Sequence, residues 1–92
     1  MDVTLVNIDA NPAPSALDYP VVITLEIDGQ QETFDLKMRP TAFPELGAGL
    51  LVPGEALTRR LQDHQDVLNR LSRVVARQLE GTGVHLPQLI AA

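Results

Sequence analysis

The hydrophobic residues between positions 55 and 80 recur at the spacing of an α-helix. When residues 55–80 are placed at about 100° per residue, the aliphatic side chains of this stretch gather in one arc of roughly 140°. They are Leu57, Leu61, Val67, Leu68, Leu71, Val74, Val75 and Leu79. Polar side chains occupy the opposite face, no Gly or Pro interrupts the run, and Gly81 stands where a left-handed helix cap is expected. The pattern predicts one long amphipathic helix over Glu55–Glu80.

Two earlier stretches alternate between apolar and polar residues, which is the pattern of a half-buried strand. They cover residues 21–28 and 32–39, and a glycine lies in the short segment between them. The two stretches therefore predict a β-hairpin with an apolar face towards the helix and a charged face towards water.

The turn of this hairpin has two candidate positions. A two-residue turn at Gly29-Gln30 is favoured, because it pairs Leu25 with Phe34 and keeps apolar residues opposite one another. A turn at Asp28-Gly29 keeps the same faces together but places Glu32 opposite Leu25.

The N-terminal stretch Val3–Asp9 is rich in β-branched residues and predicts a strand. Its alternation is ambiguous, because apolar residues fall on both faces, so either both faces are partly covered or the strand lies at an edge. Ala10–Asp18 carries two prolines and reads as an extended connection. It is either a plain loop or a hinge that lets the first strand pair with a neighbouring subunit.

Two further stretches are unusually apolar for connections. Pro40–Gly54 combines three prolines and three glycines with several large apolar residues. Because loops are usually polar, this one either tucks beneath the helix or meets a partner, and a short strand at Gly49–Val52 is possible. The tail Val84–Ile90 is apolar enough to dock as a short strand or a helical turn.

These elements predict a single α+β domain over residues 1–92, with a three- or four-stranded antiparallel sheet and one long amphipathic helix packed on one face. A helix of 26 residues spans about 39 Å, whereas a strand of seven residues spans about 23 Å. A small sheet would leave part of the apolar helix stripe uncovered. A second helix from another subunit is the simplest cover, so the length predicts a homodimer.

Composition and charge narrow the function classes. Cysteine is absent, which excludes thiol catalysis, cysteine-ligated zinc and disulfides. No signal peptide and no run of about 20 apolar residues is found, so we expect a cytoplasmic protein without a membrane partner. Residues 1–46 carry eight acidic against two basic residues, and residues 47–92 carry four against five. Because phosphate binding needs clustered basic residues, nucleic acid is an unlikely partner and the arginines of the helix are read as a solvated face.

Three polar residues fall in or beside the apolar arc: His64 at its centre, and Arg60 and Gln78 on its flank. The favoured interpretation is that Arg60 extends to water and that His64 is a neutral, hydrogen-bonded core histidine. The alternative is that all three meet partner side chains at an interface.

Candidate chemistry is sparse. Of the two serines, Ser15 lies in the proline-rich connection and Ser72 does not face His64, so no nucleophile and base are paired. Neither histidine has a second ligand one turn away, and Gly47-Ala48-Gly49 lacks the Lys-Ser/Thr of a phosphate loop. We therefore predict no catalytic, metal-binding or cofactor-binding residues. A small enzyme using His64 and Arg60 is the weakest alternative.

Short motifs in three places give a resemblance to a known family. Tyr19-Pro20, Phe43-Pro44-Glu45-Leu46-Gly47 and Leu86-Pro87 occur in this order, with the predicted helix before the last. This layout resembles antitoxins of the HicB type, although here the first spacing and the helix are longer and a strand precedes the first motif. The resemblance implies a toxin-binding protein, which we keep as an alternative. A further alternative is a nucleic-acid-associated regulator that uses the arginines of the helix.

The function predicted from the residues is a non-enzymatic protein–protein interaction module, a homodimer that acts through the apolar helix stripe and the Pro40–Gly54 loop. Its partners are a second copy and an unidentified protein. The predicted partner-binding residues are Phe43, Leu46, Leu50, Leu51, Arg60, His64, Leu68, Leu71 and Gln78.

Overall fold

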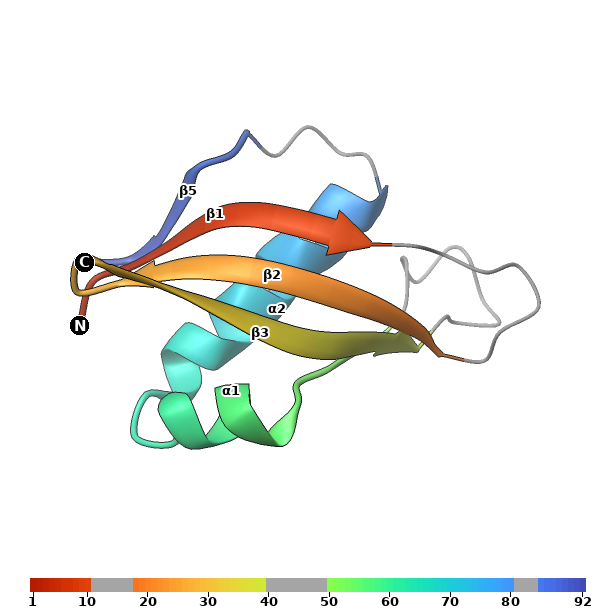
Figure 1. Ribbon diagram of the computed structural model, residues 1–92, viewed down its shortest axis with the longest axis horizontal. Coiled ribbons are helices and arrows are strands. Elements are labelled where there is room, and N and C mark those ends of the chain that lie inside the picture. Colours follow the sequence, from red (N-terminus) through yellow and green to blue (C-terminus); the bar gives the residue numbers. More distant parts are fainter. Residues whose placement is uncertain (11–17, 40–49, 81–84) are drawn as a thin grey trace.

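The fold is a curled antiparallel sheet wrapped around a helix. The computed structural model describes residues 1–10, 18–39, 50–80 and 85–92 (Figure 1). Its elements are β1 (Val3–Ala10), β2 (Tyr19–Ile27), β3 (Gln30–Arg39), β4 (Leu50–Val52), α1 (Glu55–Arg60), α2 (Gln65–Glu80) and β5 (Gln88–Ala91). The five strands lie in the order β4-β3-β2-β1-β5.

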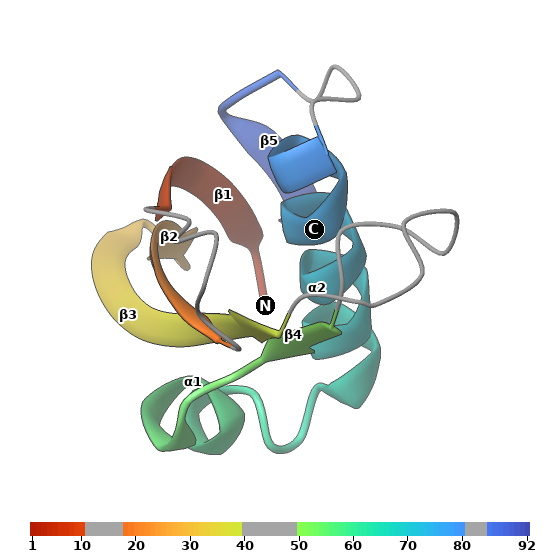
Figure 2. The same ribbon diagram turned by 90° about the vertical axis from the view of Figure 1, so that its right-hand side faces the viewer.

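The predicted α+β class is confirmed, whereas the predicted strand number and the single helix are wrong. The short strands β4 and β5, at the two ends of the sheet, bring the number of strands to five. The sheet curls so that both end strands lie against α2 (Figure 2). The apolar residues of the segments before α1 and at the C-terminus explain these additions, because each segment adds a strand with one buried aliphatic side chain, Leu51 in β4 and Ile90 in β5.

The predicted hairpin of β2 and β3 is confirmed, but its turn lies at the position that was not favoured. Asp28 and Gly29 have φ angles of 50° and 87°, and positive φ at both central residues defines a type I′ turn. Leu25 is therefore opposite Glu32, and Phe34 is opposite Ile23. The twist of this turn matches that of the strands, which outweighs the apolar pair that the other register would have made.

β1 contains a β-bulge that explains its ambiguous pattern. Leu5 pairs with Leu25 and Asn7 pairs with Thr24, so Val6 is the extra residue. A bulge moves the following side chains to the other face. Val3 and Leu5 are consequently buried before it, whereas Ile8 and Ala10 pack against the core after it. β1 lies between β2 and β5 rather than at an edge, and it pairs within its own chain.

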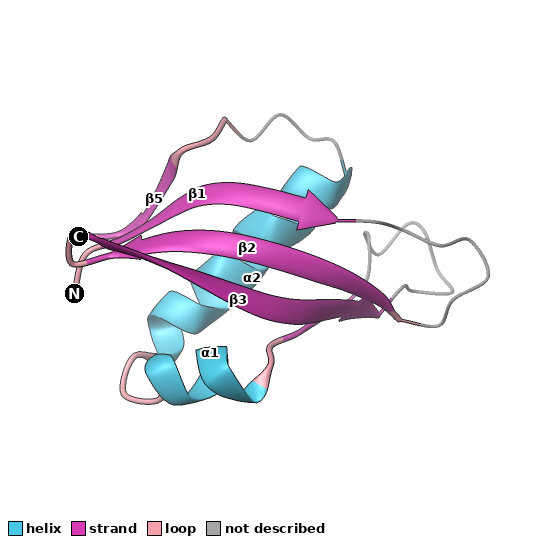
Figure 3. Cartoon of the chain, viewed as in Figure 1, coloured by secondary structure: helices cyan, strands magenta, loops and turns pink. Residues whose placement is uncertain are grey.

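Two helices replace the single helix predicted over Glu55–Glu80. α1 ends at Arg60 and α2 begins at Gln65, and the residues between them turn the chain (Figure 3). A continuous helix would have placed His64 in the middle of the buried stripe. At the break, His64 is only half-buried, so it is not the core histidine that the arc predicts.

The backbone remains hydrogen-bonded through this break. The His64 amide donates to the Leu61 carbonyl at 2.9 Å. The His64 carbonyl then accepts from the amides of Val67 and Leu68 at 3.1 and 3.2 Å, which starts α2. These bonds satisfy part of the backbone at the break, which lowers the cost of interrupting a helix.

The apolar arc of the helical region is buried within the chain. Its members with at most 6% exposure are Leu57, Leu61, Val67, Leu68, Leu71 and Val75. Val74 and Leu79 are partly buried against the same core, which the inner face of the sheet completes. The described residues therefore leave no large apolar helix surface that a second helix would have to cover. The sheet curls around the helical region, and the break in the helix lets both helices pack against it.

The remaining predictions concern the connections. The possible strand at Gly49–Val52 is confirmed as β4, and the tail forms β5. Most of Ala10–Asp18 and of Pro40–Gly54 lies outside the described residues, so their predicted roles as hinge and partner-binding loop stay predictions.

Candidate functional site

The candidate site is built around the end strand β4. It pairs with β3 through Met38 opposite Leu51 and Lys37 opposite Val52. Within the described parts of the chain, no strand pairs with its other edge. Figure 2 shows β4 between β3 and α2. Unpaired backbone groups on an end strand are a template on which another chain can add a strand.

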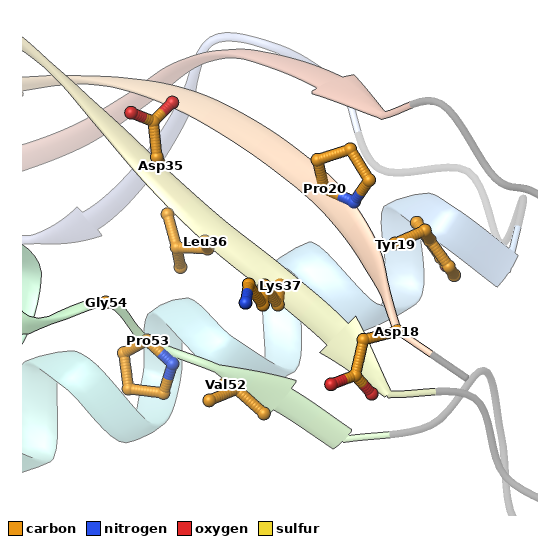
Figure 4. A pocket seen from close by; sticks show the side chains of 9 residues that line it. All are labelled: Asp18, Tyr19, Pro20, Asp35, Leu36, Lys37, Val52, Pro53 and Gly54. Atoms are coloured by element: carbon orange, nitrogen blue, oxygen red, sulfur yellow. The ribbon is translucent and has the colours of Figure 1, made fainter. Parts of the chain in front are cut away.

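A depression of about 490 Å³ lies beside β4 on the outer side of the sheet (Figure 4). Val52, Pro53 and Pro20 give it apolar walls, and Asp35 and Lys37 of β3 add one charge of each sign. The other lining residues are Asp18, Tyr19, Leu36 and Gly54. It can accommodate an apolar side chain, but its opposite charges give no preference for an anion or a cation.

Gly54 holds the start of α1 close to β3 at this depression. A Cβ atom at Gly54 would lie 2.6 Å from the Asp35 carbonyl oxygen, so a larger residue would push the two segments apart. Nearby, Arg39 Nε donates to Asp18 Oδ1 at 3.2 Å, which joins the ends of β2 and β3. Burial raises the pKa of the Tyr19 phenol above its usual 10.0, so it stays neutral at physiological pH.

A groove of about 490 Å³ lies on the other side of β4, between this strand and α2. We call it the β4–α2 groove, and it is lined by Leu51, Pro53, Gln65, Leu68, Asn69, Ser72 and Arg73. The helix residues are three or four positions apart, so they form one face of α2. Leu51 and Leu68 are buried, whereas Asn69 and Arg73 are exposed. The groove therefore has an apolar base and a polar helix wall.

A third depression, of about 590 Å³, contains the pair considered for catalysis, Arg60 and His64. Arg60 is not free to act there, because its guanidinium forms an ion pair with Glu32 at 3.3 Å. The walls of this depression include the exposed side chains of Arg59 and Asp63. The depression is thus broad and wet, which suits a catalytic base poorly.

The nine predicted partner-binding residues are distributed over several places. Leu51 and Leu68 meet at the base of the β4–α2 groove, and Leu71 is fully buried in the core. Phe43 and Leu46 lie outside the described residues.

The other predicted residues do not gather at one site. Leu50 begins β4. Arg60 and His64 line the third depression, and Gln78 is half-buried near the end of α2. The structure therefore brings Leu51 and Leu68 together in the β4–α2 groove, and it places Arg60 and His64 in a different depression.

The sequence reasoning missed Arg73, Asn69 and Val52 as residues beside the groove or the strand. The helical spacing does place Asn69 next to Ser72 and Arg73, and Ser72 next to Leu68, which is the one signal that was present. What the spacing could not show is that an end strand lies along that face of the helix.

No family model, curated protein or solved structure matches this chain. The resemblance to HicB-type antitoxins stays a prediction.

Two searches of the described residues concern metals and membranes. They contain no group of three or more His, Cys, Asp or Glu side chains that could hold a metal ion. Likewise, none of the described helices is both long and apolar enough to cross a bilayer.

Proposed function

We propose that this protein is a non-enzymatic interaction module that binds another protein along β4. The observation that carries the proposal is an end strand with one edge that no described strand pairs, and with a hollow on each side. In strand addition, backbone hydrogen bonds supply affinity, and pockets for alternate side chains supply specificity. Since side chains alternate across a strand, a partner strand at β4 would direct them to the two sides in turn.

The arginines support this proposal over nucleic-acid binding. Arg59 forms an ion pair with Glu55, Arg60 pairs with Glu32, and Arg70 donates to a backbone carbonyl. Their charged groups are therefore engaged within the chain, whereas binding of a phosphate backbone requires a cluster of available cations.

The homodimer predicted from helix length stays a prediction, and its first basis is gone because the apolar stripe is covered. Light scattering over a micromolar concentration range tests it directly. A dimer mass that Val52→Lys reduces to a monomer mass would support pairing of two β4 strands about a two-fold axis. A monomer at every concentration would leave a different protein as the partner.

The proposal as a whole is tested by affinity capture with the wild-type chain and two variants of it, Val52→Lys and Thr33→Lys. Val52→Lys places a charge on the end strand, which opposes strand addition. Thr33→Lys is the matched control, because Thr33 is exposed on the outer face of β3 and lines neither hollow beside β4. We expect the wild-type chain and the control to retain the same protein, and Val52→Lys to lose it.

Thermal unfolding of the three forms shows whether each is folded. Capture of the same proteins by all three forms, or of none by the wild-type chain, would contradict the proposal.

A further inference from the structure

We propose that the β4–α2 groove receives an extended segment of a partner protein, and that this segment carries an acidic side chain that pairs with Arg73. This inference rests on the proposed function and adds the chemistry of the partner. It is carried by three observations, which are the shape of the groove, its apolar base and its single charge.

The shape of the groove fits an extended chain better than a helix. One wall is β4, whose three residues span about 10 Å. The other wall is a face of α2 from Gln65 to Arg73. A strand that lies between them can bond to the β4 backbone on one side and contact helix side chains on the other, which is the arrangement of strand addition.

The base of the groove requires apolar side chains from the partner. Leu51 and Leu68 are 6% and 5% exposed, so their accessible atoms are at the base of the groove rather than on its rim. The polar groups of the wall already have partners. Gln65 donates to Asn69 at 3.2 Å, and the Ser72 hydroxyl donates to the Leu68 carbonyl at 2.9 Å. They therefore create no strong demand for a polar ligand.

Arg73 is the exception in this wall. Among the described residues that line the groove, it is the only charged one. It is exposed and forms no ion pair or hydrogen bond with a described residue. The chain as a whole has a net charge of −5. A single available cation beside an apolar base favours a segment that combines apolar residues with a carboxylate, and it disfavours a basic one.

The test uses the isotope-labelled full chain and two short synthetic peptides with capped ends. In one peptide valine alternates with glutamate, and in the other valine alternates with lysine. We expect the glutamate peptide to shift the amide resonances of β4 and of residues 65–73, and to bind about tenfold more tightly than the lysine peptide, since a favourable and an unfavourable surface pair each contribute a few-fold.

Two variants test whether the charge of Arg73 sets the peptide preference and whether the peptides occupy the groove. Arg73→Glu should reverse the preference between the two peptides, whereas Arg59→Glu makes the same charge change on α1 and should keep the preference. Asn69→Trp fills the groove from an exposed helix position and should weaken both peptides. Arg73 and Asn69 are exposed, so neither change should alter the fold, which thermal unfolding checks.

The outcomes separate this inference from the proposed function. If neither peptide shifts the groove resonances, or if Arg73→Glu leaves the preference unchanged, the inference is wrong. In that case, loss of the captured protein by Val52→Lys alone would still support binding along β4. If the glutamate peptide binds at the groove but Val52→Lys captures the same proteins as the wild-type chain, the groove chemistry holds and the proposed role of the β4 edge is wrong.

Discussion

β5 and β4 are both short end strands beside α2, but they differ in whether a side chain of α2 bonds to their backbone. Arg70 Nη1 donates to the Ile90 carbonyl of β5 at 2.8 Å, so a backbone group of this strand is already occupied. Arg73, three residues further along α2, forms no hydrogen bond or ion pair with a described residue, and it lines the groove beside β4. The same helix therefore bonds to the backbone of one end strand and lines a groove beside the other.

This difference matters because end strands tend to pair with other chains. Proteins commonly protect them with charged side chains, bulges or a covering element. β5 has such protection, since Arg70 contacts it and its pairing with β1 is irregular near Ala91. The exposed Leu89, at 58%, projects from this protected strand. The contrast teaches that an exposed apolar side chain can project from a strand whose backbone is already engaged.

The largest effect is expected from the side chain that anchors β5. Ile90 is 1% exposed, and Ile90→Ala should lower the free energy of unfolding by about 3 kcal/mol, because it removes buried methyl groups and leaves a cavity. Leu89→Ala on the same strand should change it by less than about 0.5 kcal/mol. Urea unfolding followed by circular dichroism measures both. Equal effects would show that β5 is not held by its inner face.

A smaller loss of unfolding free energy is expected beside β4. Gly54→Ala should cost about 2 kcal/mol, because the added Cβ meets the Asp35 carbonyl oxygen and forces the segments apart. Gly29→Ala is the contrast: no atom lies within 4 Å of its added Cβ, and its positive φ alone should cost about 1 kcal/mol.

Hydrogen exchange locates these two losses. Gly54→Ala should speed exchange of the β4 amides. Gly29→Ala should leave the difference between the exchange free energy of the β4 amides and the free energy of global unfolding as it is in the wild type. Unchanged β4 protection in Gly54→Ala would mean that the close approach does not hold this strand.

The most direct test of the contrast compares two arginines of α2. Arg70→Met should cost about 1.5 kcal/mol, because the Ile90 carbonyl loses a charged donor while the apolar stem is kept. Arg73→Met should be within about 0.5 kcal/mol of the wild type, because no described partner is lost. Thermal or urea unfolding of the pair decides the matter. If both changes had the same effect, the two edges would not differ in the way proposed.

The hairpin and the buried arc were predictable because each rests on a local pattern. Alternation along β2 and β3 identifies the inner face, and the helical spacing identifies six side chains that are indeed buried. The choice of turn was wrong because apolar pairing was weighted above turn geometry. Asp-Gly is a strong type I′ signal, and Glu32, opposite Leu25, is accommodated by its ion pair with Arg60.

The helix break was not predictable from glycine or proline, but its position was marked by polar residues. Arg60 and His64 were the residues that did not fit the apolar arc. In the structure, Arg60 closes α1 and reaches Glu32, and His64 precedes α2. Their misfit coincides with a change of direction of the chain. Their predicted role at an interface stays a prediction.

The candidate site could not be predicted, because it depends on pairing between distant segments. Residues 50–52 give no long alternation, and only their register with residues 37–39 makes them an end strand. The groove then requires α2 to lie beside that strand. Neither relation is present in a local pattern, so Arg73 looked like any other residue of a solvated face.

Both ends of the chain lie at the opposite end of the sheet from β4 (Figure 1). Asp2 and Asp28 are joined by two hydrogen bonds, which fasten the first residues beside the β2–β3 turn, and Ala91 pairs with Val3. A dye, affinity handle or solid support attached to either terminus would therefore sit away from β4. Immobilised protein should keep this strand accessible to a partner in solution.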